Sequence, residues 1–139
     1  MKIHTSTIQV KTRGESDIID ITEKVKEEIT RTEVINGSLL LFIPGSTAAL
    51  TTIEAESGVI NDLRKAIERI IPKNILYDHD RQWGDGNGHA HVRAALIGPS
   101  LNIPVLNRRL LLGTWQQVVL VDFDNRPRNR EIVIQVVGE

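Results

Sequence analysis

The residue types most able to do chemistry gather in one short stretch of the chain, residues 77–91. It holds three of the four histidines, together with three aspartates, one asparagine and three glycines. Imidazole and carboxylate groups can hold a first-row divalent metal or exchange protons near neutral pH. Apolar segments follow closely on both sides. We therefore expect an ordered loop that binds or catalyses, not a disordered one.

A metal site is the first chemistry that this stretch could support. His89 and His91 are two residues apart, which puts both rings on one side of an extended segment, where they could chelate one ion. His79 and Asp85 would complete a nitrogen-and-oxygen set that suits zinc or another divalent metal. If a helix already begins at His89, the two rings diverge by about 200° and cannot chelate together. The alternative is a loop without metal, in which one histidine caps the helix and another hydrogen-bonds locally.

Proton transfer is the second chemistry, with a histidine as the titrating group. A carboxylate such as Asp85 or Glu54 could orient the imidazole, although Glu54 could equally be a solvated strand residue. The chain has no Gly-x-Ser-x-Gly elbow. We therefore expect Ser46 to be a turn residue and not a nucleophile.

Anion binding is the third chemistry. The segment 85–88 reads Asp-Gly-Asn-Gly and precedes an expected helix start. Free backbone N–H groups and the positive end of a helix dipole would favour a phosphate there. The same residues are also ordinary turn residues. Arginine side chains could add phosphate ligands, but a solvated turn is the commoner explanation for the arginines at 126, 128 and 130.

Length and composition limit the classes of protein to consider. The 139 residues, 40% of them apolar, fit one domain over residues 1–139 with a single core. A net charge of −1 provides no basic field, so neither nucleic acid nor a membrane is expected as a partner. The absence of cysteine excludes disulfides and thiolate chemistry. No apolar leader opens the chain and no stretch reaches transmembrane length, so we expect a cytoplasmic protein.

The elements that must position the polar stretch follow from apolar periodicity. Helical spacing and stop signals predict helices over 20–32 and 57–71, and a short one that begins near 88–91 and ends at Gly98-Pro99. Runs and alternation of apolar residues predict strands. We expect 49–55 to pair with 38–43, and 117–123 to form a hairpin with 131–137. The predicted strands are 3–12, 38–43, 49–55, 101–106, 117–123 and 131–137.

Motifs spread over nearly the whole chain resemble those of one family. They are the Ser100–Val105 segment, Gly113-Thr114-Trp115-Gln116, His91 with the Ala94-Leu96-Gly98 run, and Thr47-Ala48-Ala49 with Glu54. On these residues the chain resembles the YjbQ family, also known as secondary thiamine-phosphate synthase enzymes. The resemblance implies an α+β fold, an α/β sandwich in which helices pack on a mixed, largely antiparallel β-sheet. It also implies a homotrimer with a polar site near the subunit contacts.

His89 departs from the family pattern, and the site residues that the resemblance implies are Ser46, Thr47, Glu54, His79, Asp85, Asn87, His91, Thr114 and Gln116. Together with the chemistry of the chain's other residues, they give three sets. For catalysis we expect Glu54, His79, Asp85 and His91. If a divalent metal is bound, zinc or magnesium, we expect His79, His89, His91 and Asp85 to hold it, and no organic cofactor is expected. The substrate-binding residues would be Ser46, Thr47, Asn87, Arg93, Arg109, Thr114 and Gln116.

The activity that the resemblance implies joins a pyrimidine-methyl diphosphate to a thiazole phosphate and releases pyrophosphate. The leaving charge must be neutralised by a metal or by arginine, and Arg93 and Arg109 are the expected phosphate partners. The dedicated synthase is a barrel of about 250 residues, so a shared activity would arise on an unrelated scaffold. We expect a weak thiamine-phosphate synthase that acts on phosphorylated substrates. The alternatives are a non-catalytic homotrimer that binds a metal or an anion, and a scaffold that only binds partners.

Overall fold

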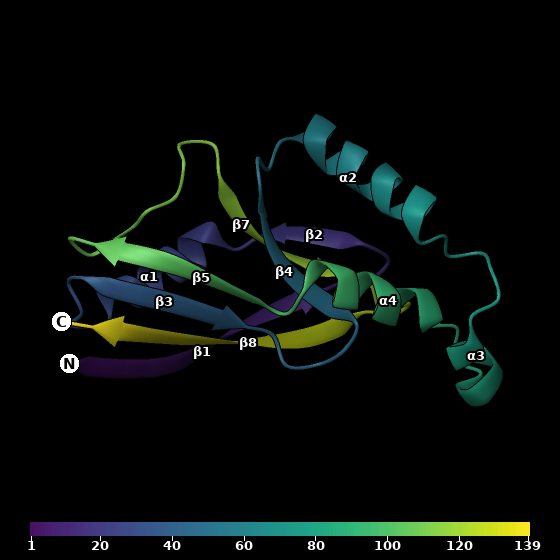
Figure 1. Cartoon of the computed structure of the whole chain (residues 1–139), viewed down its shortest axis with the longest axis horizontal. Coiled ribbons are helices and arrows are strands. Elements are labelled where there is room, and N and C mark those ends of the chain that lie inside the picture. Colours follow the sequence, from purple (N-terminus) through teal and green to yellow (C-terminus); the bar gives the residue numbers. More distant parts are fainter.

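Two antiparallel sheets and four helices make up the computed structural model, which describes all residues 1–139 (Figure 1). The five-stranded sheet has the order β1-β8-β3-β5-β6 and the three-stranded sheet the order β2-β7-β4. Every strand pair is antiparallel, which confirms the predicted α+β class. The elements are β1 (Lys2–Thr12), β2 (Asp17–Asp20), α1 (Thr22–Thr30), β3 (Gly37–Phe42), β4 (Ala48–Ile53), α2 (Ser57–Ile70), α3 (Asp78–Trp83), α4 (Gly88–Ile97), β5 (Ser100–Leu106), β6 (Arg109–Leu110), β7 (Gln117–Asp122) and β8 (Arg128–Gly138).

Strand β7 is the centre of the packing because both of its faces are covered. Val118 and Leu120 belong to the main core, which the five-stranded sheet and α1 also line. Val119 and Val121 face a second core, which includes Ala90 of α4 and Ile67 of α2. The continuous apolar run of this strand is the pattern expected for a strand buried on both faces. Strand β8 instead alternates, with Ile132, Ile134 and Val136 buried.

Two predicted strand pairings are wrong. Strand β3 pairs with β5 and β8, whereas β4 pairs with β7 in the other sheet. The β7 and β8 strands likewise lie in different sheets and form no hairpin. The reason is that β7 is apolar on both faces and must therefore lie between two packed layers. Strands with alternating residues, such as β8, can leave one face to solvent. Strand β3 also alternates: Leu39 and Leu41 are buried, while Leu40 is 39% exposed.

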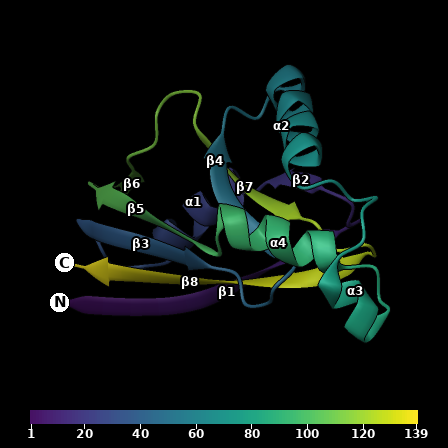
Figure 2. The same ribbon diagram turned by 45° about the vertical axis from the view of Figure 1, so that its right-hand side comes forward.

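The polar stretch 77–91 is folded into two helices instead of one long loop. It contains α3 and the first turn of α4, which together lie at the end of the molecule away from both chain termini (Figure 2). Gly84, with φ 66°, ends α3 in the left-handed conformation that glycine adopts readily. Across the chain as a whole, none of the helices combines the length and the apolar character that crossing a membrane would need.

Candidate functional site

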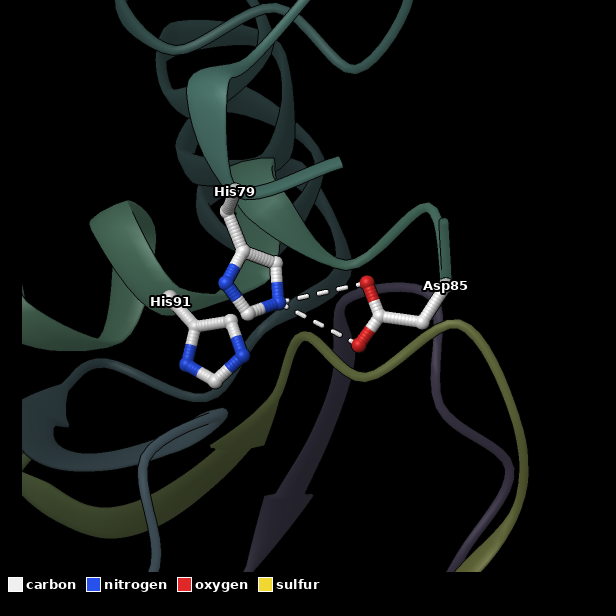
Figure 3. Close-up of side chains that lie close together, drawn as sticks. All are labelled: His79, Asp85 and His91. Carbon is white, nitrogen blue, oxygen red and sulfur yellow. Dashed lines mark hydrogen bonds and ion pairs between the residues drawn. The ribbon is translucent and has the colours of Figure 1, made fainter. Parts of the chain in front are cut away.

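Three side chains from the polar stretch meet at one point. His79 comes from α3, Asp85 from the turn after it, and His91 from the first turn of α4 (Figure 3). One ligand atom of each lies within 4.8 Å of the others. The Nε2 atom of His79 is 3.2 Å from both carboxylate oxygens of Asp85. The ring centroids of His79 and His91 are 4.4 Å apart. We refer to these three residues as the His-Asp-His cluster.

The turn between α3 and α4 holds Asp85 in place. The backbone N–H of Asn87 donates to Asp85 Oδ1 at 3.2 Å. The side-chain amide of Asn125 donates to the Asp85 carbonyl oxygen at 2.6 Å. The hydrogen bond from Asn87, with a further one from His79, outweighs partial desolvation and lowers the pKa of the Asp85 carboxyl. Asp85 is therefore a carboxylate at neutral pH, the form that binds a metal.

Close packing between the two helices brings His79 to His91. The backbone N–H of Gly88 donates to Asp80 Oδ1 at 2.9 Å, which ties the first residue of α4 to α3. A Cβ atom on Gly88 would lie 2.4 Å from the Cβ of Tyr77, so only glycine fits at this contact. Asn87 is the residue before α4, but its side chain does not cap the helix. Its Oδ1 instead accepts from the backbone N–H of Asn125 at 2.9 Å.

A buried network of charges lies behind the cluster, and sequence reasoning missed it. Asp122 and Asp124 are fully buried. Thr47 Oγ1 donates to Asp124 Oδ2 at 2.9 Å, and Arg128 Nη2 donates to the same oxygen at 3.0 Å. Burial raises the pKa of Asp124, but hydrogen bonds from Arg128, Thr47 and Asn87 outweigh it and leave the pKa lowered. Two aspartates that directly follow an apolar run were the available sequence signal.

A groove opens beside His91. It has a volume of about 340 Å³ and is lined by the turn before β4 and by α4, with Gly45, Ser46, Ala48, His91, Ala94, Ala95 and Pro99 at its walls. The hydroxyl of Ser46 makes no hydrogen bond within the chain and is exposed. A small molecule in this groove could therefore contact both Ser46 and one ring of the cluster.

His89 does not join the cluster, which corrects its prediction as a fourth metal ligand. The helix begins at Gly88, so residues two apart point to different sides, as the alternative interpretation required. His89 is 1% exposed, and its Nε2 atom has no hydrogen-bond partner. Burial, followed by the nearby positive charges of Arg93 and Lys73, lowers the pKa of His89. The ring is therefore a neutral part of the interior.

Arg93 is also occupied elsewhere, which corrects its prediction as a phosphate ligand. Its side chain is buried, and its guanidinium donates to the Ile71 carbonyl oxygen, to Ser16 Oγ and to Glu68. These contacts fasten the end of α2 to α4. Arg93 comes two residues after His91 in α4, so the two side chains point to different sides of the helix. The side chain of Arg93 lies on the buried side.

The remaining predicted residues lie at the far end of β4. Arg109, Thr114 and Gln116 line a second groove of about 460 Å³ that also contains Lys26 and Arg108. Gln116 Nε2 donates to Thr52 Oγ1 at 3.0 Å, near the end of β4. Glu54 is exposed just beyond that strand. Thr47 precedes the same strand, and six residues of strand span about 20 Å. Within one chain, the predicted site residues therefore form two separate groups.

Fold and site together define a class: an α+β protein of two antiparallel sheets with a histidine-aspartate cluster at one end. The model of the family described as "UPF0047 protein YjbQ-like" matches residues 6–139. The chain belongs to this YjbQ/UPF0047 family.

Relatives agree in sequence and in fold. A UPF0047 protein from Archaeoglobus fulgidus is 35% identical over 94% of this chain and 98% of its own length. The UPF0047 protein YugU from Bacillus subtilis is 34% identical over 95% of this chain and 98% of its own length. A hypothetical protein from Aeropyrum pernix K1 has a crystal structure with a TM-score of 0.90 and 34% identity, covering 98% of this chain and 99% of that one. A YbjQ-like protein of unknown function from Sulfolobus solfataricus P2 gives a TM-score of 0.89 at 28% identity, covering 99% of this chain and 100% of that one.

Proposed function

We propose that the chain binds a divalent metal through His79, Asp85 and His91 and acts with it on a phosphorylated or otherwise anionic small molecule. The observation that supports this is the approach of three ligand atoms to within 4.8 Å of one another from three different local elements. Two imidazoles and one carboxylate match the ligand sets of catalytic zinc sites, which keep a fourth position open for water or substrate.

The cluster needs only small movements to hold an ion. Ligand atoms around tetrahedral zinc are about 3.3 Å apart, given bond lengths of about 2.0–2.1 Å. His79 Nε2 and Asp85 Oδ2 are already 3.2 Å apart. His91 must approach by a rotation of its partly exposed side chain. A bound metal would polarise a phosphoryl or carbonyl oxygen and stabilise a leaving phosphate. The groove beside His91 would then hold the substrate, with the Ser46 hydroxyl as a polar contact.

Metal content tests the first half of the proposal. Protein stripped with a chelator and reloaded with zinc should retain about one ion per chain by elemental analysis. His91→Ala and Asp85→Ala should lower the zinc affinity by more than roughly tenfold, because even outer-shell partners of zinc are worth that much. His4→Ala is the matched control, since His4 lies on β1 outside the cluster. Zinc content that is equal in His91→Ala and the wild-type protein would exclude the site.

Activity tests the second half. We propose a weak thiamine-phosphate synthase reaction, or a related transfer to or from a phosphorylated substrate, on the basis of family membership. Metal-loaded protein should form thiamine phosphate from the pyrimidine-methyl diphosphate and the thiazole phosphate, and His79→Ala should abolish product formation. A protein that binds zinc but forms no product above background would favour the second candidate, a non-catalytic trimer that binds a metal or an anion.

A further inference from the structure

We propose that Arg130 is the residue that holds the anionic group of the ligand, a phosphate or similar oxyanion, at the edge of the groove beside His91. This inference rests on the proposed function, whose ligand it describes further. The sequence suggested a solvated turn for this arginine. The structure instead places it in β8 with a side chain only 12% exposed.

The guanidinium of Arg130 is fixed along one edge and free along the other. Its Nε and Nη2 atoms donate to the two carboxylate oxygens of Asp122 at 2.7 and 2.9 Å. Nη2 also donates to Thr47 Oγ1 at 2.7 Å. Nη1 makes no hydrogen bond within the chain. The buried side-chain atoms without a partner are His89 Nε2 and Arg128 Nε, so Nη1 is not among them and reaches solvent.

Because Gly45 has no side chain, it leaves Nη1 of Arg130 uncovered next to the groove. A Cβ atom on Gly45 would lie 3.4 Å from Arg130 Nη1, which is the only atom it would meet. Gly45, Ser46 and His91 line the same groove. Arg130 is not itself a wall of this groove, but a molecule beside Gly45 and Ser46 would lie close to both Arg130 Nη1 and His91.

The pairing with Asp122 prepares Arg130 to bind an anion. A two-point contact with a fully buried carboxylate fixes the plane of the guanidinium, so little side-chain freedom is lost when a ligand binds. The same carboxylate offsets much of the positive charge. We therefore expect weak binding of an oxyanion by Nη1 alone, and tighter binding when a zinc ion at the cluster adds positive charge beside His91.

Phosphate binding by full-length variants tests the assignment. Titration of inorganic phosphate, followed by calorimetry or ³¹P NMR, should show an affinity in Arg130→Gln that is lower by roughly one to two powers of ten, the usual contribution of a hydrogen bond to a charged group. Arg126→Gln is the matched control, because it removes the same charge from an exposed position in the adjacent turn. Its phosphate affinity should stay within about twofold of the wild-type value.

A second variant controls for the case in which Arg130→Gln fails to fold. Arg130→Gln leaves Asp122 buried without its cation, so Asp122→Asn/Arg130→Gln, which replaces the charged pair with two amides, is measured as well. Loss of phosphate binding in either folded variant, with zinc content unchanged, supports the assignment. Loss of phosphate binding in protein that holds no zinc would support Arg130 while overturning the proposed metal site. Wild-type affinity in both variants, or no phosphate binding by the wild-type protein with and without zinc, overturns the assignment.

Discussion

His89 and His91 show how strongly the surroundings decide the chemistry of one residue type. His91 faces the cluster and the groove, whereas His89 is enclosed between α4 and the elements packed against it. Among the charged groups near His89, Arg93 and Lys73 disfavour its protonation, and Glu15 and Asp80 favour it less strongly. Burial is the largest effect, and the pKa of His89 is lowered below its usual value of 6.5.

This lowered pKa predicts how stability depends on pH. Unfolded chains take up a proton on His89 near pH 6.5, whereas the folded protein takes it up only at a lower pH. The free energy of unfolding should therefore fall as the pH drops from 6.5 to the folded pKa, and be unaffected by His89 above that window. Urea unfolding at a series of pH values should show a weaker decline in His89→Leu. His4→Gln serves as the control, and an unchanged decline in His89→Leu would contradict the prediction.

Gly88 is the second position where a single residue decides the site. Gly88→Ala should destabilise the protein by about 1–3 kcal/mol, because the added Cβ would overlap Tyr77 and force α3 away from α4. The displacement should also weaken zinc binding, since His79 lies on α3. Gly113→Ala is the matched control, because the nearest atom to its Cβ would be 3.5 Å away. Equal urea midpoints for the two variants would show that the contact is not tight.

At the scale of elements, β7 and α2 stand at opposite extremes of packing. Strand β7 is covered on both faces, whereas α2 lies at the periphery of the fold (Figure 1). Ile67 is the only buried residue of α2. The helix has an apolar stripe, but Ile70 at its end is 67% exposed. Polar contacts fasten it further: Arg64 donates to the Ser16 carbonyl oxygen, and Glu68 pairs with Arg93.

Hydrogen exchange should reveal this difference. Amide protons of α2 should exchange through local opening, with protection well below that of β7, because opening α2 exposes little buried apolar surface. Ile67→Ala should reduce the protection of α2 further. The protection of β7 in this variant should match its protection in a control variant that is destabilised by the same amount. Gly88→Ala can provide that control. Protection of α2 equal to that of β7 in the wild-type protein would show that something else covers the helix.

At the scale of the whole molecule, the two groups of predicted site residues are separated by the length of β4. The cluster and its groove lie at one end, and Arg109, Thr114 and Gln116 lie at the other. A small ligand cannot reach both within one chain. Large apolar side chains are exposed near both ends: Leu96 on α4 is 66% exposed, and Trp115 beside the second groove is 72% exposed. Contiguous exposed apolar patches often mark contacts between subunits, and Leu96 and Trp115 would be the centres of such patches.

If the chain forms the homotrimer that the family resemblance implies, we expect the subunit contacts to bury these side chains. Light scattering after size exclusion should give a mass three times the 15.6 kDa of the chain. Leu96→Glu or Trp115→Glu should shift the mass toward the monomer, since a charge would then be buried at the contact. Lys11→Glu, on an exposed position of β1, is the control for the change of charge. A monomeric wild-type protein at micromolar concentration would contradict the prediction.

The sequence by itself determined the longer elements and the place of the cluster, but not β2, α3 and β6. Apolar periodicity located the long strands and helices, because side-chain direction along a strand or helix depends only on local backbone geometry. The density of histidine, aspartate and glycine in 77–91 pointed to the candidate site, and His79, Asp85 and His91 do lie close together there. The family motifs gave the fold class. Arg128 and Arg130, two residues apart, lie on one face of β8, a local signal that the interpretation as a solvated turn missed.

Only the tertiary structure decided which of these residues share a site. The backbone N–H of Phe123 donates to the Thr47 carbonyl oxygen, and the backbone N–H of Asn125 donates to Asn87 Oδ1. The guanidinium of Arg130 donates to Thr47 and to Asp122. Most of these pairs are far apart in the sequence. Spacing along the chain carries no information about such contacts, because their free energy arises when distant segments pack together. The same packing fixes the start of α4 at Gly88. Because α4 begins there, the side chain of His89 points into the core and that of His91 points toward the groove.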